Sequence, residues 1–143
     1  MFITRATRHD QPDRLAFFEE HEWDNHTGTL KEIPFIARDG GIVGNVSLLE
    51  VDPQTLIVED VLVHKERRKE GIGRQLMQAA MNSRGGKLFL CCHPDTLDFY
   101  SKFGFTEVPF DELPERIQQL MIEDDATPHQ IAEGHVHHFL TAR

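Results

Sequence analysis

Apolar residues in the first half of the chain alternate or run continuously in a way that predicts four strands and one helix. The pattern predicts strands over residues 2–6, 33–38, 42–51 and 55–63, and a helix over residues 12–21 with Leu15, Phe17 and Phe18 facing inward. Asp39-Gly40-Gly41 is typical of a hairpin turn between the second and third strands. The run Thr55–Val63 is nearly continuous in apolar and β-branched residues, which favours a central strand buried on both faces.

The second half of the chain alternates between helical and extended patterns. Apolar residues at 72, 76, 79 and 80 recur with a helical period and predict a helix over residues 73–83, ended by Gly85-Gly86. The remaining pattern predicts strands over residues 87–92, 105–108 and 135–141 and helices over residues 94–102 and 111–123. This order predicts an α/β fold, in which a mixed central sheet with parallel neighbours is flanked by helices. The length predicts one domain spanning residues 1–143.

Composition narrows the class of protein. The chain is 39% hydrophobic and 27% charged, which is ordinary for a globular protein, and no apolar run approaches the ~20 residues that span a bilayer. Residues 1–5 lack the apolar core of a signal peptide. Cys91 and Cys92 are adjacent, and neighbouring residues of a strand point to opposite faces, so we expect no mutual disulfide. These features favour a reducing, cytoplasmic location.

Charge changes this picture at one place. The chain carries a net charge of −9, yet residues 65–74 hold five of its 15 Lys and Arg and two of its 24 Asp and Glu. The net charge of that window is therefore +3, and the net charge of the rest of the chain is −12. A small basic segment in an acidic protein favours one anionic ligand and argues against general binding of nucleic acid.

The same window has the local features of a phosphate site. An apolar strand ends near Val63, a basic loop follows, and Gly71 and Gly73 stand at the start of the next helix. Backbone N–H groups at a helix N-terminus have no intrahelical partner, and the helix dipole adds partial positive charge there. Glycines remove side chains, so that a ligand can approach the backbone closely. This arrangement indicates a phosphate or pyrophosphate ligand.

Three kinds of glycine loop compete for this segment. The sequence lacks the Gly-x-x-x-x-Gly-Lys-Ser/Thr string of a nucleotide triphosphate loop, and Leu76 stands where a dinucleotide fingerprint needs its third glycine. Residues 68–73, Arg-Lys-Glu-Gly-Ile-Gly, fit the pattern Gln or Arg, two residues, Gly, one residue, Gly or Ala. Residues 98–105, Asp-Phe-Tyr-Ser-Lys-Phe-Gly-Phe, follow at a separation that suits one helix, one strand and another helix start. Together these two signatures resemble the GNAT superfamily of N-acetyltransferases over about residues 42–109.

The resemblance implies acetyl-coenzyme A as co-substrate and no metal. It implies an enzyme that moves an acetyl group directly to a primary amine. The residues that it implies for cofactor binding are Val61, Leu62, Val63, Arg68, Lys69, Glu70, Gly71, Ile72, Gly73, Arg74 and His93. The backbone of residues 61–63 is expected to bind the pantetheine arm and to supply the N–H group for the oxyanion. His93 stands where the family often has Asn, and it is also an alternative general base.

Two residues are candidates for proton transfer. Tyr100, the single tyrosine of the chain, falls on the tyrosine position of the family and is the candidate acid for the departing thiolate. Strand alternation places Glu59 on one side with Ile57, Val61 and Val63, and it is the candidate base or water relay. Asp60, on the opposite side, is the alternative base. The structural alternatives are a core aromatic for Tyr100 and a solvent-facing residue at a strand bulge for Glu59.

The acceptor is not fixed by these signatures. The acidic remainder of the chain favours a cationic amine, such as an amino acid or a polyamine, over nucleic acid or a membrane. A protein lysine or N-terminal acetyltransferase and a non-catalytic acetyl-coenzyme A sensor stay open as alternatives, as does a homodimer. His135, His137 and His138 form a cluster whose first two members share a strand face, which permits a metal, although a substrate-side or exposed edge is favoured.

Overall fold

The computed structural model describes residues 1–25, 28–124 and 137–143. The chain divides into two compact units, Met1–Gly86 and Lys87–Arg143. Among the described residues, no helix is both long and apolar enough to cross a lipid bilayer. The expectation of one domain over residues 1–143 stays a prediction.

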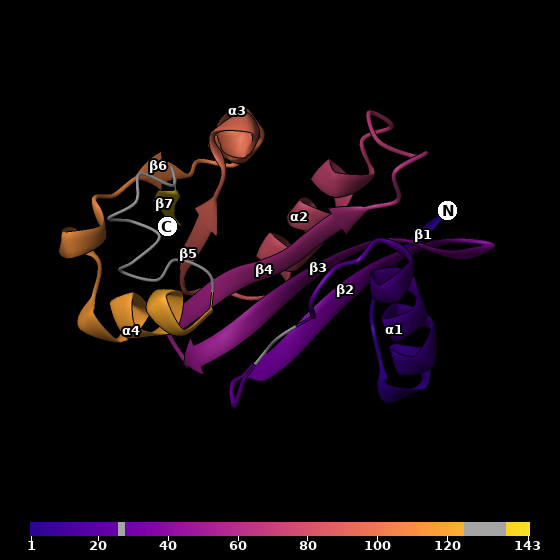
Figure 1. The fold of residues 1–143 in the computed structure, drawn as a ribbon, viewed down its shortest axis with the longest axis horizontal. Coiled ribbons are helices and arrows are strands. Elements are labelled where there is room, and N and C mark those ends of the chain that lie inside the picture. The colour runs from indigo at the N-terminus through magenta and orange to yellow at the C-terminus, as the bar shows by residue number, and fades with distance from the viewer. Residues whose placement is uncertain (26–27, 125–136) are drawn as a thin grey trace. The chain divides into compact units, whose positions relative to one another are not determined.

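The N-terminal unit is an antiparallel sheet with two helices (Figure 1). Its strands pair in chain order, β1 with β2, β2 with β3 and β3 with β4. The elements are β1 (Phe2–Arg5), the short 3-10 helix η1 (Arg8–Asp10), α1 (Gln11–Glu20), β2 (Lys31–Asp39), β3 (Gly41–Asp52), β4 (Thr55–Val63) and α2 (Ile72–Ser83). The hairpin turn falls at Gly40, whose φ of 82° is the left-handed conformation that glycine adopts without strain.

The two helices cover opposite faces of this sheet. Asn45 on β3 is hydrogen-bonded by Arg14 of α1, whereas a Cβ atom built on the preceding Gly44 would meet Leu76 and Ile72 of α2. Successive residues of a strand point to opposite faces, so α1 lies on the Asn45 face and α2 on the Gly44 face. Buried apolar residues under α1 form one core cluster, made of Ala6, Phe17, Phe18, Ile36, Ile42 and Leu62.

A bulge interrupts β4 where it pairs with β3. Ser47 lies opposite Glu59 and Asn45 lies opposite Leu62, so three steps along β4 match two steps along β3. Asp60, inside this step, has a φ of 52°, which is uncommon for a residue other than glycine. The bulge therefore brings Glu59 and Leu62 to the same face of the sheet.

The C-terminal unit contains three paired strands. β5 (Lys87–Cys92) and β6 (Thr106–Glu107) both pair antiparallel with β7 (His138–Ala142). Its helical elements are η2 (Pro94–Thr96), α3 (Leu97–Ser101), η3 (Phe110–Glu112) and α4 (Glu115–Asp124). The spacing of Leu113, Ile117, Leu120 and Met121 predicts one inward stripe, of which Leu113, Ile117 and Met121 are buried and Leu120 is half-buried.

The sequence-based elements hold with several corrections. The helix expected over residues 94–102 is the 3-10 helix η2 followed by the short α3, and the strand expected over residues 105–108 is the shorter β6. Leu15 is 50% exposed, whereas Arg14 is 2% exposed and takes the inward position on α1. The helix expected over residues 111–123 is two elements, because Pro114 cannot continue the first one. Val63 pairs with Gly44 and so lies on the face opposite to Glu59, since the bulge shifts the alternation of β4. The strand expected from residue 135 begins at His138 within the described residues, and His135 lies outside them.

The close packing of α2 on Gly44 generates a prediction about stability. A valine at position 44 would place its Cβ 2.8 Å from Cδ1 of Leu76 and 3.1 Å from Cγ2 of Ile72. We expect Gly44→Val to lower the free energy of unfolding by about 1–3 kcal/mol, as overpacked cores do. Urea denaturation measures this loss. Gly41→Val is the control, because a Cβ at Gly41 meets no atom within 4 Å, and an equal loss in both variants would contradict the packing argument.

Candidate active site

The basic loop between β4 and α2 has the backbone of an anion site. We call residues 64–71 the phosphate loop. Gly71 caps α2 with a φ of 82°, and Lys69 is also left-handed, at 71°. Gln75 donates its N–H to the Gly71 carbonyl, so the first three N–H groups of α2 precede the first intrahelical hydrogen bond. These groups, with the positive end of the helix dipole, can accept an anion.

The side chains of the phosphate loop divide into those that hold the loop and those that keep their charge for a ligand. Arg67 contacts both oxygens of Glu70, at 3.0 and 2.9 Å, and Asp39 at 3.0 Å. The hydrogen bonds to Glu70, and then to Asp39, raise the pKa of Arg67. Within the described residues, Lys69 and Arg74 contact no carboxylate. The loop therefore keeps uncompensated positive charge beside the N-terminus of α2.

The bulge in β4 sets the positions of the two candidate bases. Glu59 is half-buried and shares the α1 face of the sheet with Ser47, its partner on β3. Asp60 is 5% exposed, and its carboxylate accepts hydrogen bonds from Trp23 Nε1 at 2.9 Å and Asn25 Nδ2 at 2.6 Å. Its carboxylate oxygens thus hold the segment after α1. Glu59 is more accessible to a substrate than Asp60.

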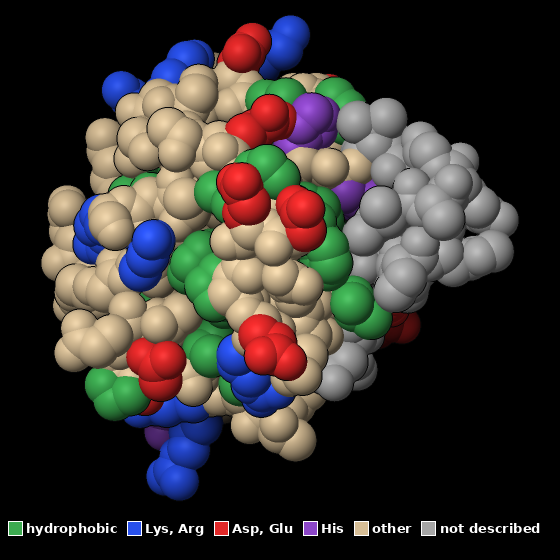
Figure 2. Space-filling view, turned by 90° about the vertical axis from the view of Figure 1, so that its left-hand side faces the viewer, with side chains coloured by type: hydrophobic (Ala, Val, Ile, Leu, Met, Phe, Trp, Pro, Cys, Tyr) green, Lys and Arg blue, Asp and Glu red, His purple; other side chains and the backbone are tan. Residues whose placement is uncertain are grey.

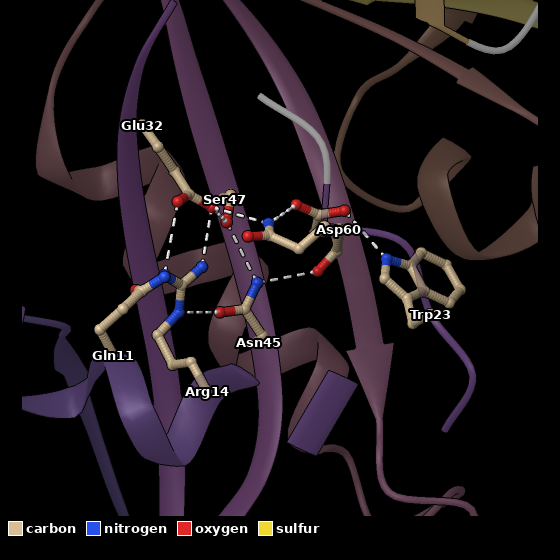
Figure 3. Close-up of polar contacts among 8 residues, drawn as sticks. Gln11, Arg14, Trp23, Glu32, Asn45, Ser47 and Asp60 are labelled. Atoms are coloured by element: carbon tan, nitrogen blue, oxygen red, sulfur yellow. Dashed lines mark hydrogen bonds and ion pairs between the residues drawn. The ribbon is translucent and has the colours of Figure 1, made fainter. Parts of the chain in front are cut away.

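A buried polar network fixes this bulge from the side of α1 (Figure 3). Arg14 donates to Asn45 Oδ1 at 3.1 Å, to Gln11 at 2.7 Å and to Glu32 at 2.7 Å. Asn45 is fully buried and donates to the Asp60 carbonyl at 3.0 Å and to Ser47 Oγ at 3.1 Å. The backbone of the bulge is therefore held by a side chain, which in turn is held by a guanidinium on α1.

The Arg14 guanidinium of this network pairs with one carboxylate, that of Glu32. Ser47 Oγ donates to Glu32 at 2.6 Å, so Glu32 accepts from both Arg14 and Ser47. The Asp60 carboxylate accepts hydrogen bonds from the neutral groups of Trp23 and Asn25. With Glu59 on the same face, this part of the N-terminal unit carries more negative than positive charge. Such a surface attracts cations.

Sequence reasoning did not identify Arg14, Trp23, Glu32, Asn45 or Ser47. A signal for two of them lies in the strand over residues 42–51, where polar residues at 45 and 47 interrupt an otherwise apolar segment at alternate positions. That spacing places both on one face, which indicates a polar partner above the sheet. The identity of the partner, a guanidinium from a helix 31 residues earlier, is set by tertiary packing.

The candidates in the C-terminal unit lie around α3. Tyr100 is 7% exposed, and its ring stands 5.0 Å from that of Phe99 and 6.0 Å from that of Phe105. The ring thus packs among aromatic side chains, as the structural alternative expects, and the reaction role of its hydroxyl stays a proposal. His93 is exposed at the N-terminus of η2, and its carbonyl accepts the N–H of Thr96.

The cysteines and C-terminal histidines have local partners. Cys91 Sγ lies 3.6 Å from His137 Nδ1, and the rings of His137 and His93 lie 5.4 Å apart. His138 contacts Glu107 on β6. Cys92 is buried, which raises the pKa of its thiol. Over residues 1–25, 28–124 and 137–143, no group of three or more His, Cys, Asp and Glu is placed to hold a metal ion.

Solved structures share this fold at low sequence identity. N-acetylglutamate synthase from Neisseria gonorrhoeae, complexed with coenzyme A and L-arginine, aligns with a TM-score of 0.67 and 17% identity over 99% of this chain and 32% of its own. This chain therefore spans about a third of the length of that synthase. An acyl-CoA N-acyltransferase from Pseudomonas aeruginosa aligns with a TM-score of 0.66 and 16% sequence identity over 99% of both chains. An aminoglycoside 6'-N-acetyltransferase complexed with coenzyme A aligns with a TM-score of 0.64 and 16% sequence identity. The alignment covers 99% of this chain and 96% of the acetyltransferase.

These likenesses confirm the expected fold class, a mixed sheet flanked by helices of the acyl-CoA N-acyltransferase type. No curated protein sequence matches the chain. The sequence model of the acetyltransferase (GNAT) domain matches residues 31–107, which is more than half of the chain and includes both signatures. The chain therefore belongs to the GNAT family of acetyltransferases, enzymes of the acyltransferase class that use acetyl-coenzyme A.

Proposed function

We propose that this enzyme transfers the acetyl group of acetyl-coenzyme A directly to the primary amine of a small cationic molecule, such as an amino acid or a polyamine. The observation that carries the proposal is the phosphate loop, where two left-handed residues and the N-terminus of α2 present N–H groups and positive charge. The phosphate loop lies inside the segment that matches the family model, and we assign it to the pyrophosphate of the cofactor.

The remaining cofactor contacts follow along β4. The backbone of residues 61–63 binds the pantetheine arm, and its N–H groups stabilise the oxyanion of the tetrahedral intermediate. A bulge beside this segment supports the assignment, because residues in a bulge leave the regular ladder. Arg68, Lys69 and Arg74 add charge at the pyrophosphate, whereas Glu70 contributes backbone and holds Arg67. His93 contacts the cofactor through its exposed side chain.

Proton transfer uses two groups. An alkyl ammonium has a pKa of about 10.4, so its deprotonation at pH 7 costs about 4–5 kcal/mol. Glu59, half-buried on the face that carries the carboxylates, drains this proton directly or through water. Tyr100 donates its phenolic proton to the departing thiolate. Asp60 is not assigned this role, because its carboxylate is buried against Trp23 and Asn25.

Charge supports a cationic acceptor. The net charge of the chain is −9, and Glu32, Glu59 and Asp60 lie on or beside the α1 face of the sheet, where Glu32 pairs with the guanidinium of Arg14. On the face drawn in Figure 2, Asp and Glu side chains lie among hydrophobic ones, and Lys and Arg side chains lie around them. A cytoplasmic location is part of the proposal, since neither Cys91 nor Cys92 is in a disulfide.

A panel of amines with acetyl-coenzyme A, followed by thiol release, tests this function. We expect turnover with small amines that carry a second positive charge or an exposed primary amine, and weaker turnover with lysine peptides. Binding of coenzyme A without turnover on any amine would overturn the enzyme mechanism in favour of a sensor. Turnover with peptides alone would show that the acceptor is a protein amine and not a small molecule.

Coenzyme A binding by a Gly73→Val variant tests the pyrophosphate site. Gly73 lies in the first turn of α2, and a branched side chain there blocks approach to the free N–H groups. We expect coenzyme A to bind about tenfold more weakly or worse, by isothermal titration calorimetry, and pantetheine, which lacks the pyrophosphate, to be unaffected. Gly85→Val, beyond the other end of α2 in open space, is the control. An equal loss for both ligands would contradict the assignment.

The Tyr100→Phe variant tests the acid. The ring and its aromatic contacts stay, while the proton donor is removed. General acid groups contribute about 10²- to 10⁴-fold, so we expect kcat to fall at least about tenfold with little change in the Kd for acetyl-coenzyme A. Steady-state kinetics measure this. Phe103→Leu removes a ring from the same aromatic group and is the control for packing. Full activity in Tyr100→Phe would leave the tyrosine a purely structural role.

The pH profile of a Glu59→Gln variant tests the base. A glutamine cannot accept the amine proton, so we expect kcat/KM to fall most near neutral pH and to recover in part at high pH, where free amine is abundant. Asp60→Asn is the matched control. Its effect acts through the bulge and is expected to be independent of pH. An unaltered profile in Glu59→Gln would move the base to Asp60, His93 or bulk water.

A further inference from the structure

His21, at the C-terminus of α1, contacts the start of the phosphate loop. The backbone N–H of Lys65 donates to His21 Nε2 at 3.3 Å, and His21 Nδ1 lies 2.9 Å from the Phe17 carbonyl. Because Nε2 accepts, the proton of the neutral ring is on Nδ1 and is donated to that carbonyl. Both ring nitrogens of His21 are therefore used, and only the neutral ring can make both contacts.

His64 makes the corresponding contact one residue further along. The N–H of Glu66 donates to His64 Nδ1 at 3.1 Å, and His64 Nε2 lies 3.5 Å from Glu20 of α1. The backbone of His64 is fixed to β3, since its N–H donates to the Val43 carbonyl at 2.8 Å. Two neighbouring N–H groups of the phosphate loop are thus accepted by two imidazoles, whose rings meet edge to face at 4.9 Å.

Resting on the proposed cofactor site, we infer that His21 and His64 are positioning residues for the phosphate loop and make coenzyme A binding sensitive to acid. Protonation of either ring puts an N–H at the nitrogen that now accepts, so that two donors face each other. Protonation of both also places two cations 4.9 Å apart. The loop then loses the contacts that hold Lys65 and Glu66.

The groups around the two rings do not compensate for this loss. His21 faces the Phe17 ring and carbonyl, the His64 ring and the Lys65 N–H. His64 also faces the carboxylate of Glu20, which stabilises a charged His64 ring through its Nε2 atom. The Nδ1 atom of the charged ring nevertheless carries a proton, so it cannot accept the N–H of Glu66. Histidine is the side chain that changes charge between pH 5 and 8. Affinity for coenzyme A therefore falls when acid protonates these rings.

Paired substitutions separate this role from a purely structural one. His21→Gln and His64→Asn each offer an amide oxygen where the ring nitrogen accepts, and neither amide titrates. His21→Ala with His64→Ala removes both acceptors. At pH 7.5 we expect the alanine pair to bind coenzyme A about three- to tenfold more weakly than wild type, and the Gln/Asn pair to recover most of that loss.

Acid is the decisive variable. Between pH 7.5 and 5.5 we expect wild type to lose about three- to tenfold more affinity than the Gln/Asn pair, measured by calorimetry. Titration of the phosphates of coenzyme A is common to both proteins and cancels in this comparison. His9→Gln, at an exposed histidine near the other end of α1, is expected to follow wild type. Parallel pH dependence in wild type and the Gln/Asn pair would overturn the inference.

A readout without ligand keeps the inference distinct from the proposed function. Absence of coenzyme A binding by wild type would refute the cofactor site itself. Nitrogen-15 spectra of the unliganded protein then decide the role of the histidines. We expect His21 as the Nδ1–H tautomer at pH 7.5, and a Lys65 amide that shifts together with protonation of that ring. The Nε2–H tautomer, or a Lys65 amide indifferent to pH, would overturn the inference.

Discussion

The bulge at Asp60 in β4 is the constraint on which the N-terminal unit depends. One extra residue in this strand turns Leu62 toward the core under α1 and Val63 toward the other face, while Glu59 stays on the α1 side. A left-handed residue other than glycine costs about 1–3 kcal/mol, so the conformation needs support from its surroundings. Asn45 holds the Asp60 carbonyl, and Trp23 and Asn25 hold its carboxylate.

Helix α1 connects this bulge to the phosphate loop. Near its start, Arg14 reaches Asn45 and Glu32, and at its end His21 accepts the Lys65 N–H. The segment that follows the helix then carries Trp23 and Asn25 to Asp60. One helix therefore positions both the strand that is proposed to carry the base and the loop that is proposed to bind the cofactor. A change in its packing is expected to affect both.

Charge is separated in a way that suits a two-substrate transfer. Positive charge that no described carboxylate neutralises lies on Lys69 and Arg74, beside the N-terminus of α2, where an anionic cofactor would bind. Excess carboxylate lies on the α1 face, where Arg14 is enclosed by Glu32, Gln11 and Asn45. Arg67 is compensated by Glu70 and Asp39, which leaves the uncompensated positive charge to the residues nearest the helix.

The sequence by itself determined the order of elements, the family and the phosphate loop. These follow from local patterns: strand and helix periods, two glycines that follow a basic loop at positions 71 and 73, and two signatures at a fixed separation. Tertiary structure alone decided which side chains face one another. Arg14, and not Leu15, is the inward residue because Asn45 and Glu32 offer it partners from two strands. The alternation of β4 fails at Asp60 because contacts from α1 and from the segment after it stabilise a bulge there. Such contacts join residues 18 to 37 positions apart, and no local pattern encodes them.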